Sequence, residues 1–476
     1  MKYQISINKA LENFIEIEAK INVNSTEINL QLPAWRPGRY ELGNFAKNIR
    51  GFKAKAKNGE LLKHRKVTKD SWKIFNTNQN TEITICYEYY ANQLDAGACF
   101  INLEQIYVNP VHCFMYEVGK MDETFEVTLN VPENYKIACQ LPVINKTFVA
   151  QNFDQLADSP FIASATLQHK SFKLNETTFH FWFQGKHVID LKQLELDTLA
   201  YAKTQIDIFK EMPCKNYHFL YQMLPNAFRH GVEHADSTVI TMGQGTDSLY
   251  DDFYNDLLAI SSHELFHLWN IKRIRPAEML PYDFTKENYS TLGYVYEGVT
   301  TYYGDLMLLR SGVWSWEQYA ESWNNDFQRH ITNLGNKNYS VAESSFDTWL
   351  DGYVMGVPER KVSIYIEGML AAMLADLIII KNSNGLYSLD NVMHDLYHLF
   401  YKKNIGYTEN DYKLLLEKYG EESFEHYFED IIWGKNNLIA ELQNILPYFD
   451  CYITNNKIAK TLESENNLLF NFLLNR

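Results

Sequence analysis

The sequence has few cysteines, no long apolar run, and fewer basic than acidic residues. Six cysteines occur in 476 residues, and no two of them form a CxxC pair. Scattered cysteines are typical of reduced, buried thiols and argue against a disulfide framework or a cysteine-based metal site. The six are Cys86, Cys99, Cys113, Cys139, Cys214 and Cys451.

No stretch of the sequence is apolar over the length that a bilayer requires. The longest such run, 368–380, is interrupted by Asp376 and falls short of the roughly 20 residues of a transmembrane helix. The opening residues, MKYQISINKALENFIEIEAKI, lack the apolar core of a secretory signal peptide. We therefore expect a cytoplasmic protein with no membrane partner.

Acidic residues outnumber basic ones by 59 to 44, which gives a formal net charge of -15 and a pI near 5.4. A surface that binds nucleic acid needs clustered Lys and Arg, so this balance argues against a nucleic-acid partner. It suits an enzyme that attracts cationic groups, such as the amino terminus of a peptide.

Length and patterning predict a multidomain α+β protein, because 476 residues exceed one ordinary domain. Residues 1–185 predict an N-terminal β-sandwich. Apolar and polar residues alternate along 15–23 and 125–131, and turn residues separate such segments. A strand at 179–183 is expected to close this domain.

Residues 186–460 predict a catalytic domain with a mixed sheet to about residue 250 and helices after it. Strand candidates lie at 217–224 and 237–242. Helical spacing then dominates, at 301–310, 364–380, 391–401 and 408–419. Residues 461–476 form a C-terminal tail, whose apolar end predicts a last helix packing back on the domain.

The segment 261–270, SSHELFHLWN, carries two histidines four residues apart, with a glutamate directly after the first. Positions i and i+4 of an α-helix share one face, so His263 and His267 can bind one metal ion. Glu264 can reach a water on that metal without joining the ligands. Zinc lowers the pKa of such a water towards about 7, and a carboxylate can then accept its proton. The alternative, two hydrogen-bonded core imidazoles, is costly to bury beside a glutamate.

Catalytic zinc has three protein ligands and one open position, and two glutamates compete for the third place. Glu287 lies in a polar segment that is typical of a solvated loop. Glu297 lies in LGYVYEGVTTYY, an apolar and aromatic segment typical of a helix. A carboxylate buried there needs a partner, which is either a metal or, in the alternative interpretation, Arg310. Burial favours Glu297, and Glu287 stays open at this point.

Four separated stretches resemble the glycyl aminopeptidase family of zinc metallopeptidases, family sixty-one of the metallopeptidase clans. They are 263–276 (HELFHLWNIKRIRP), 296–305 (YEGVTTYYGD), 231–237 (GVEHADS, similar to GLEHxxS) and 33–40 (PAWRPGRY, similar to WxPGxY). The resemblance implies a β-sandwich domain followed by a thermolysin-like catalytic domain whose later part is mostly helical. It also implies one zinc ion held by His263, His267 and Glu297, with Glu264 as general base.

The sequence departs from the family's pattern in two places. Many relatives carry a PDZ domain after the catalytic region, and this chain ends where that module would begin, so we expect no PDZ domain. The stretch 364–368, IYIEG, resembles the family's YxKG, whose tyrosine is expected to face the substrate carbonyl. Tyr365 can donate a hydrogen bond to an oxyanion there. Glu367 stands where a lysine is usual, which puts any role of that lysine in doubt.

Glu233 precedes the strand candidate 237–242. In metallopeptidases of this build an extended substrate pairs with an edge strand beside the zinc, and a carboxylate at its start could bind a free α-ammonium. The alternative is a surface glutamate near a turn.

Together these features predict a zinc-dependent aminopeptidase that acts on peptides with free N-termini. The resemblance suggests that it prefers small first residues such as Gly or Ala. A zinc endopeptidase and a catalytically weakened peptide-binding protein are the rival hypotheses.

Overall fold

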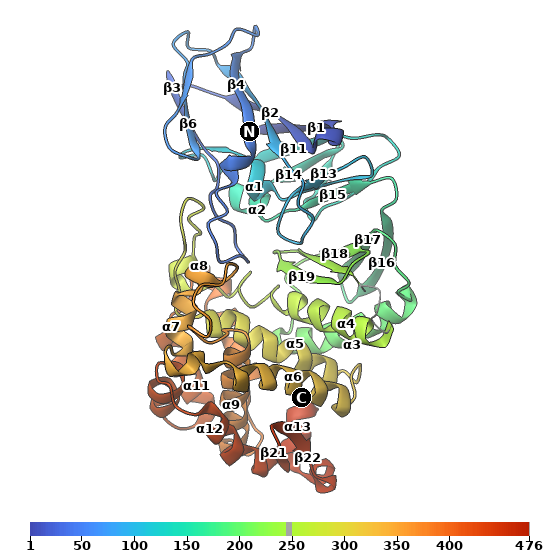
Figure 1. Cartoon of the computed structure of the whole chain (residues 1–476), viewed down its shortest axis with the longest axis vertical. Helices are drawn as coiled ribbons and strands as arrows, with labels where there is room; N and C mark the ends of the chain where they lie inside the picture. The colour runs from blue at the N-terminus through green and yellow to red at the C-terminus, as the bar shows by residue number, and fades with distance from the viewer. Residues whose placement is uncertain (244–249, 476) are drawn as a thin grey trace. The chain divides into compact units, whose positions relative to one another are not determined.

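The computed structural model describes residues 1–243 and 250–475 (Figure 1). The chain divides into two compact units, and it passes between them more than once. The first unit comprises 1–188, 214–249 and 282–287, and the second comprises 189–213, 250–281 and 288–476.

The first unit is built from β-sheets, as the alternating N-terminal segments predict. In β2, for example, Ile15, Ile17 and Ala19 are buried, whereas the residues between them are partly exposed. The largest sheet has the strand order β13-β14-β11-β1-β2-β7-β4. Its strands are β1 (Lys2–Lys9), β2 (Phe14–Asn22), β4 (Ile49–Ala56), β7 (Glu82–Tyr90), β11 (Phe125–Asn130), β13 (Val143–Ile144) and β14 (Thr147–Ala150).

Two four-stranded sheets complete the N-terminal β-rich region, with the orders β10-β3-β6-β5 and β12-β15-β9-β8. Their strands are β3 (Glu27–Gln31), β5 (His64–Lys66), β6 (Ser71–Phe75), β8 (Phe100–Ile101), β9 (Gln105–Val108), β10 (Tyr116–Glu117), β12 (Lys136–Ala138) and β15 (Phe161–Ser164). Two short helices, α1 (Pro110–Cys113) and α2 (Phe153–Ala157), lie between strands. The predicted β-rich N-terminal architecture is confirmed.

A five-stranded sheet with the order β16-β17-β18-β20-β19 also belongs to the first unit. Its strands are β16 (Gln168–Leu174), β17 (Thr177–Gln184), β18 (Asn216–Leu224), β19 (Phe228–Glu233) and β20 (Ser237–Gly243). The strands predicted at 217–224 and 237–242 are confirmed as β18 and β20. The strand predicted at 179–183 is present as β17, which pairs antiparallel with β16 and in parallel with β18. Alternation fixes the two faces of a strand but not its partner.

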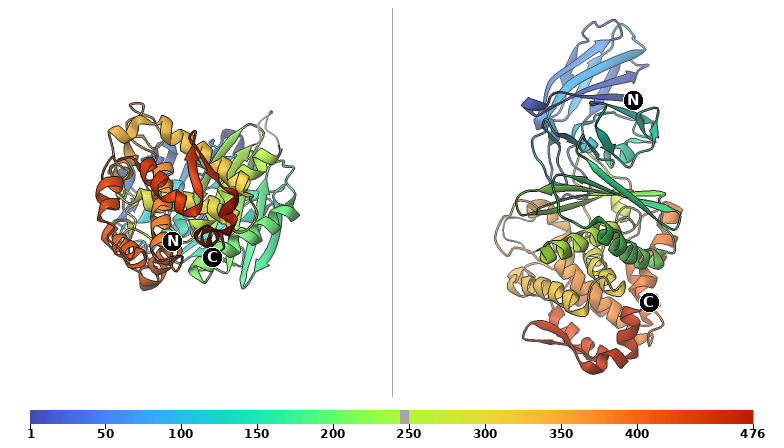
Figure 2. Two further views of the ribbon diagram at one scale, coloured as in Figure 1. Left: turned by 90° about the horizontal axis from the view of Figure 1, so that it is seen from below. Right: turned by 90° about the vertical axis from the view of Figure 1, so that its right-hand side faces the viewer.

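The second unit is mostly helical, and its helices run from green (α3, α4) to red in Figure 2. Its helices are α3 (Leu191–Phe209), α4 (Tyr250–Phe266), α5 (Thr300–Arg310), α6 (Trp316–Thr332), α7 (Val341–Phe346), α8 (Thr348–Asp351), α9 (Ile366–Asn382), α10 (Leu389–Leu399), α11 (Glu409–Gly420), α12 (Leu438–Ile445) and α13 (Leu468–Leu474). A hairpin of β21 (Cys451–Thr454) and β22 (Lys457–Lys460) lies near the C-terminus. The helices predicted from spacing correspond to α5, α9, α10 and α11.

Helix α9 forms the core of this unit. Its sequence, IEGMLAAMLADLIIIKN, is apolar nearly all round, and almost every residue of it is buried. It packs against α5, α11 and α12. The predicted last helix, α13, also packs on α9 and buries Phe470 and Leu473.

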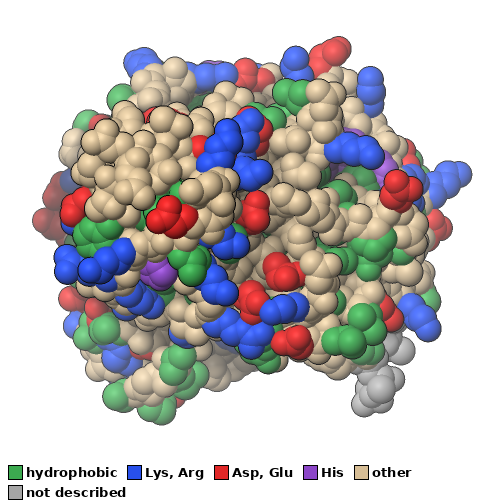
Figure 3. All heavy atoms as spheres, turned by 90° about the horizontal axis from the view of Figure 1, so that it is seen from above, with side chains coloured by type: hydrophobic (Ala, Val, Ile, Leu, Met, Phe, Trp, Pro, Cys, Tyr) green, Lys and Arg blue, Asp and Glu red, His purple; other side chains and the backbone are tan. Residues whose placement is uncertain are grey.

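Within residues 1–243 and 250–475, no helix combines the length and apolarity that crossing a bilayer requires. All six cysteines are free thiols, as their spacing predicts. On the face drawn in Figure 3, Lys and Arg side chains lie among Asp and Glu, so this face carries both charges side by side.

Candidate metal centre

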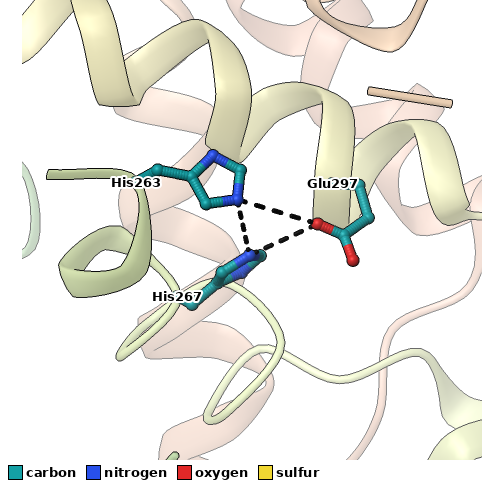
Figure 4. A group of neighbouring side chains, drawn as sticks. All are labelled: His263, His267 and Glu297. Atoms are coloured by element: carbon teal, nitrogen blue, oxygen red, sulfur yellow. Dashed lines mark hydrogen bonds and ion pairs between the residues drawn. The ribbon is translucent and has the colours of Figure 1, made fainter. Parts of the chain in front are cut away.

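His263, His267 and Glu297 converge in the second unit (Figure 4). Nε2 of His267 lies 3.0 Å from Nε2 of His263 and 3.3 Å from Oε2 of Glu297. Nε2 of His263 lies 3.9 Å from the same oxygen. Ligand atoms held at about 2.1 Å from zinc in a tetrahedron are about 3.4 Å apart, so the three atoms fit one zinc ion. Glu287, the competing candidate, is not part of the group.

Helix α4 positions both histidines. It ends at Phe266, but the N–H of His267 still donates to the carbonyl oxygen of His263 at 3.2 Å. The two imidazoles therefore keep the i, i+4 relationship that the sequence predicts. Buried neighbours, Leu265 and Phe266, fix this turn in the core, and Glu264, directly before them, is itself buried.

The protonation pattern of His267 is set by its surroundings. Its Nδ1 lies 3.0 Å from the carbonyl oxygen of Asn270. A carbonyl oxygen can only accept, so Nδ1 carries the hydrogen and Nε2 presents a lone pair towards His263 and Glu297. Such an outer hydrogen bond orients a ligating imidazole and raises its basicity.

Asn270 ties the histidine segment to the segment that carries Glu297. Its side chain is fully buried, and Nδ2 donates to the carbonyl oxygen of Val295 at 2.9 Å and to Oγ1 of Thr300 at 3.0 Å. The sequence reasoning assigned Asn270 no role. The amide of Asn270 directly follows apolar residues, which predicts that it is buried. A buried amide needs hydrogen-bond partners, and this requirement could have indicated its role.

Glu297 lies in a π-helix, Tyr294–Val299, that leads directly into α5. All six residues of the π-helix are buried, and such turns are frequent at functional sites. Arg310, the alternative partner of this carboxylate, instead lies 3.0 Å from Asp390 and 4.0 Å from Asp376. The interpretation of Glu297 as the salt-bridge partner of Arg310 is therefore wrong.

Tyr365, the residue that precedes α9, reaches the same centre. Gly298 and Gly368 touch, since a Cβ on Gly298 would lie 2.4 Å from Cα of Gly368. This close approach brings the first turn of α9 against the π-helix. The hydroxyl of Tyr365 then donates to Oε1 of Glu297 at 3.2 Å, and the side chain is 37% exposed. A phenol beside the ligand set is thus accessible to a bound substrate.

Comparison with known proteins agrees with this geometry. A family model described as the Peptidase M61 N-terminal domain matches residues 2–165, and one described as M61 glycyl aminopeptidase matches residues 256–371. Together they account for more than half of the chain, and the second includes all three converging residues. The chain belongs to the M61 peptidase family.

Solved structures share the architecture of this M61 peptidase. An aminopeptidase N family protein from Idiomarina loihiensis superposes with a TM-score of 0.90 at 28% identity, covering 95% of this chain and 79% of that one. An M1 zinc metallopeptidase from Deinococcus radiodurans, in a mutant form bound to Tyr-Ser-Ala, gives 0.55 at 13% identity, covering 92% and 94%. The second likeness shows the fold alone. No curated protein matches the chain. The family match identifies the M61 chain as a metallo-aminopeptidase.

The residue in place of the family's lysine is paired in this M61 peptidase. Oε2 of Glu367 lies 2.6 Å from Nδ1 of His330, which α6 supplies, and both side chains are buried. Glu367 therefore contacts a buried histidine of the neighbouring helix α6, a partner that no local sequence pattern indicates.

Glu233 belongs to the first unit and is the last residue of β19. The sequence placed it ahead of the strand 237–242, but β19 is itself the edge strand of the five-stranded sheet and pairs antiparallel with β20. The side chain is 7% exposed, and its carboxylate rests against Gly38. Two of the stretches that resemble the family thus meet here.

His230 lies on the same strand as Glu233. Burial, together with Arg36 and Arg39 nearby, lowers the pKa of the imidazole below its ordinary value of 6.5, although Asp95 opposes this shift. His230 is therefore neutral near pH 7 and supplies no positive charge to Glu233.

Proposed function

We propose that this M61 peptidase binds one zinc ion through His263, His267 and Glu297 and removes the first residue of peptides. The observation that carries the proposal is the convergence of three ligand atoms directly beside Glu264 and Tyr365. When bound there, zinc supplies Lewis-acid chemistry and lowers the pKa of a coordinated water to about 7.

Glu264 acts as general base in this proposal. It directly follows His263 in the sequence, and its side chain is buried. It accepts a proton from the attacking water and passes that proton to the leaving amine. Tyr365 donates its hydroxyl hydrogen to the substrate carbonyl oxygen as negative charge develops there.

Glu233 binds the α-ammonium of the substrate. Its support is a buried carboxylate, fixed against Gly38, on the edge strand of a sheet. An edge strand can pair with an extended peptide through its backbone. A blocked amino terminus would leave the Glu233 carboxylate buried without a cation, which is unfavourable. This requirement favours an exopeptidase over an endopeptidase.

A preference for small first residues, Gly or Ala, belongs to the same proposal. Its support is the matching family description, M61 glycyl aminopeptidase. The Deinococcus radiodurans neighbour binds a tripeptide, which supports peptides as the substrate class.

The proposal is tested with zinc content and hydrolysis measured on the same preparations. Wild type, Glu264→Gln and Glu264→Asp are compared on tripeptides whose first residue is Gly, Ala, Leu or Phe. We expect one zinc per chain in all three, loss of hydrolysis in Glu264→Gln, partial activity in Glu264→Asp, and fastest release of Gly or Ala. Zinc binding without any hydrolysis would favour the weakened peptide-binding protein, and internal cleavage would favour the endopeptidase.

A further inference from the structure

The segment between α8 and α9 holds a run of apolar side chains in solvent. Every residue from 352 to 359 is exposed, and we call this segment the apolar loop. Val354, Met355 and Val357 are 73%, 81% and 69% exposed. No charged residue occurs from 352 to 358. Soluble proteins rarely leave so many adjacent apolar side chains in water unless they bind something.

The base of the apolar loop is held by ion pairs. Arg360 lies 2.6 Å from Asp347 and 2.8 Å from Asp351, and Lys361 lies 3.0 Å from Asp351. The carboxylate of Asp351 and the ammonium of Lys361 are largely shielded from solvent. The loop therefore leaves the helical unit at a fixed place, with its apolar residues beyond the ion pairs.

The loop continues directly into the proposed active site. Lys361, at its base, is four residues before Tyr365, whose hydroxyl lies 3.2 Å from Glu297. In an aminopeptidase a single residue precedes the cleaved bond. A surface of several apolar side chains next to such a site can therefore serve only the residues that follow the bond.

Charge argues against a membrane as the occupant. Anionic lipid surfaces attract clustered Lys and Arg. The two cations beside the loop, Arg360 and Lys361, are neutralised by Asp347 and Asp351, and the whole chain carries a net charge of -15. A peptide chain leading away from the zinc centre is the occupant that the position of the loop supports.

We propose that the apolar loop binds apolar side chains downstream of the cleaved bond, so that the enzyme selects peptides that are hydrophobic there. This inference rests on the proposed aminopeptidase function. Met355 is ten residues before Tyr365, so the two are at most about 35 Å apart, and folding of the loop shortens that distance. An extended octapeptide spans about 26 Å and a dipeptide about 7 Å, so the octapeptide reaches much further from the cleaved bond than the dipeptide does.

The test uses two octapeptides that begin with Ala-Ala and continue with either Leu and Val or Ser and Gln. We compare kcat/KM for wild type and for a variant carrying Val354→Ser, Met355→Ser and Val357→Ser. Wild type should prefer the apolar peptide by about tenfold or more, the variant should lose that preference, and hydrolysis of Ala-Ala should not change. The three side chains already lie in solvent, so folding should be unaffected.

A matched control replaces three other exposed leucines of the second unit, Leu386, Leu414 and Leu468, by serine. This control should keep the wild-type preference. No preference in wild type, or an equal preference in the loop variant, would overturn the inference. So would a loop variant that changed vesicle binding or the sedimentation coefficient while leaving peptide preference intact, because the occupant would then be a membrane or a second copy.

Binding is measured separately from hydrolysis, with the two labelled octapeptides and the Glu264→Gln variant in fluorescence anisotropy. If wild type hydrolyses nothing but this variant still binds the apolar octapeptide more tightly through the loop, the proposed function fails and the binding surface stands. If wild type removes first residues but neither assay shows a preference for the apolar octapeptide, the proposed function stands and the binding surface fails.

Discussion

A Cβ atom on Gly38 would lie 2.6 Å from Oε2 of Glu233. Gly38 also has a φ of +73°, in the left-handed region that favours glycine. The missing side chain lets the Glu233 carboxylate rest on the backbone of the 33–40 stretch. Two family-like stretches that are far apart in the sequence therefore form one feature of the first unit.

Replacing Gly38 by alanine should move the Glu233 carboxylate and weaken capture of the substrate's amino group. We expect kcat/KM for free peptides to fall by about 10- to 100-fold, mostly through KM. Gly51→Ala is the matched control, because Gly51 has a similar φ of +68° but open space around its Cβ position. An equal loss in both variants would point to backbone strain, not to Glu233.

Replacing Asn270 by alanine should loosen the zinc centre without touching a ligand. The change removes the hydrogen bonds to Val295 and Thr300 that join the His267 segment to the π-helix. Loss of such outer-shell partners lowers metal affinity by about 10- to 100-fold. Competition with a zinc chelator measures the zinc affinity of wild type and variant. Asn109→Ala, in a buried amide of the first unit, should leave zinc affinity unchanged.

Replacing Tyr365 by phenylalanine should lower kcat with little effect on KM or zinc content. Removal of one donor to a developing oxyanion costs about 100- to 1,000-fold in kcat. The control is Tyr427→Phe, which removes a buried hydroxyl that donates to the carbonyl oxygen of Ala371. Steady-state kinetics in which KM alone rises would assign Tyr365 to binding.

His330 and Glu367 should stabilise the second unit together, whereas either group buried without the other should destabilise it. Removing one partner, as in Glu367→Ala, should cost about 3–5 kcal/mol because it leaves the other group buried alone. Glu367→Lys, which restores the family's residue, places a cation beside His330 and should also destabilise. Urea unfolding of both single variants and of the double variant measures the coupling. Additive losses would show that the two groups do not interact.

Acid should destabilise the first unit through His218. Burial, followed by the neighbouring His180 and His169, lowers the pKa of His218 to about 3, and its Nδ1 accepts a hydrogen bond from Trp182. Between pH 6.5 and 3 the unfolded chain binds a proton that the folded chain does not, so stability falls as pH falls through this window. The slope approaches about 1.4 kcal/mol per pH unit.

Thermal unfolding between pH 7 and pH 4 tests this expectation. His218→Gln removes the titrating group and should flatten the dependence. Equal slopes in wild type and His218→Gln would contradict it.

Hydrophobic periodicity in the sequence predicted many of the strands and helices. The features that it missed depend on pairing between segments far apart in the chain. Alternation gave β2 and β11, and helical spacing gave α5 and α9, because periodicity records which face of an element is buried. It could not record that the strand at 179–183 pairs with β18, since any partner satisfies the same pattern. The edge strand β19 was missed altogether.

In the candidate site, too, local features were predictable from the sequence and contacts between distant segments were not. The i, i+4 histidines and the burial of Glu297 follow from local sequence. The contact of Gly38 with Glu233 and the pairing of His330 with Glu367 join separate segments, so no local pattern contains them. The π-helix around Glu297 was predicted only as a helix, because one extra residue per turn hardly changes the hydrophobic pattern.

The most direct test of the central claim compares hydrolysis of one peptide with its amino terminus free and acetylated, by wild type and by Glu233→Gln. If Glu233 binds the α-ammonium, wild type should cleave the free peptide at least about 1,000-fold faster, releasing a single residue, and Glu233→Gln should lose most of that discrimination. Equal cleavage of the two peptides by wild type would contradict the assignment of an aminopeptidase with Glu233 as its ammonium-binding residue.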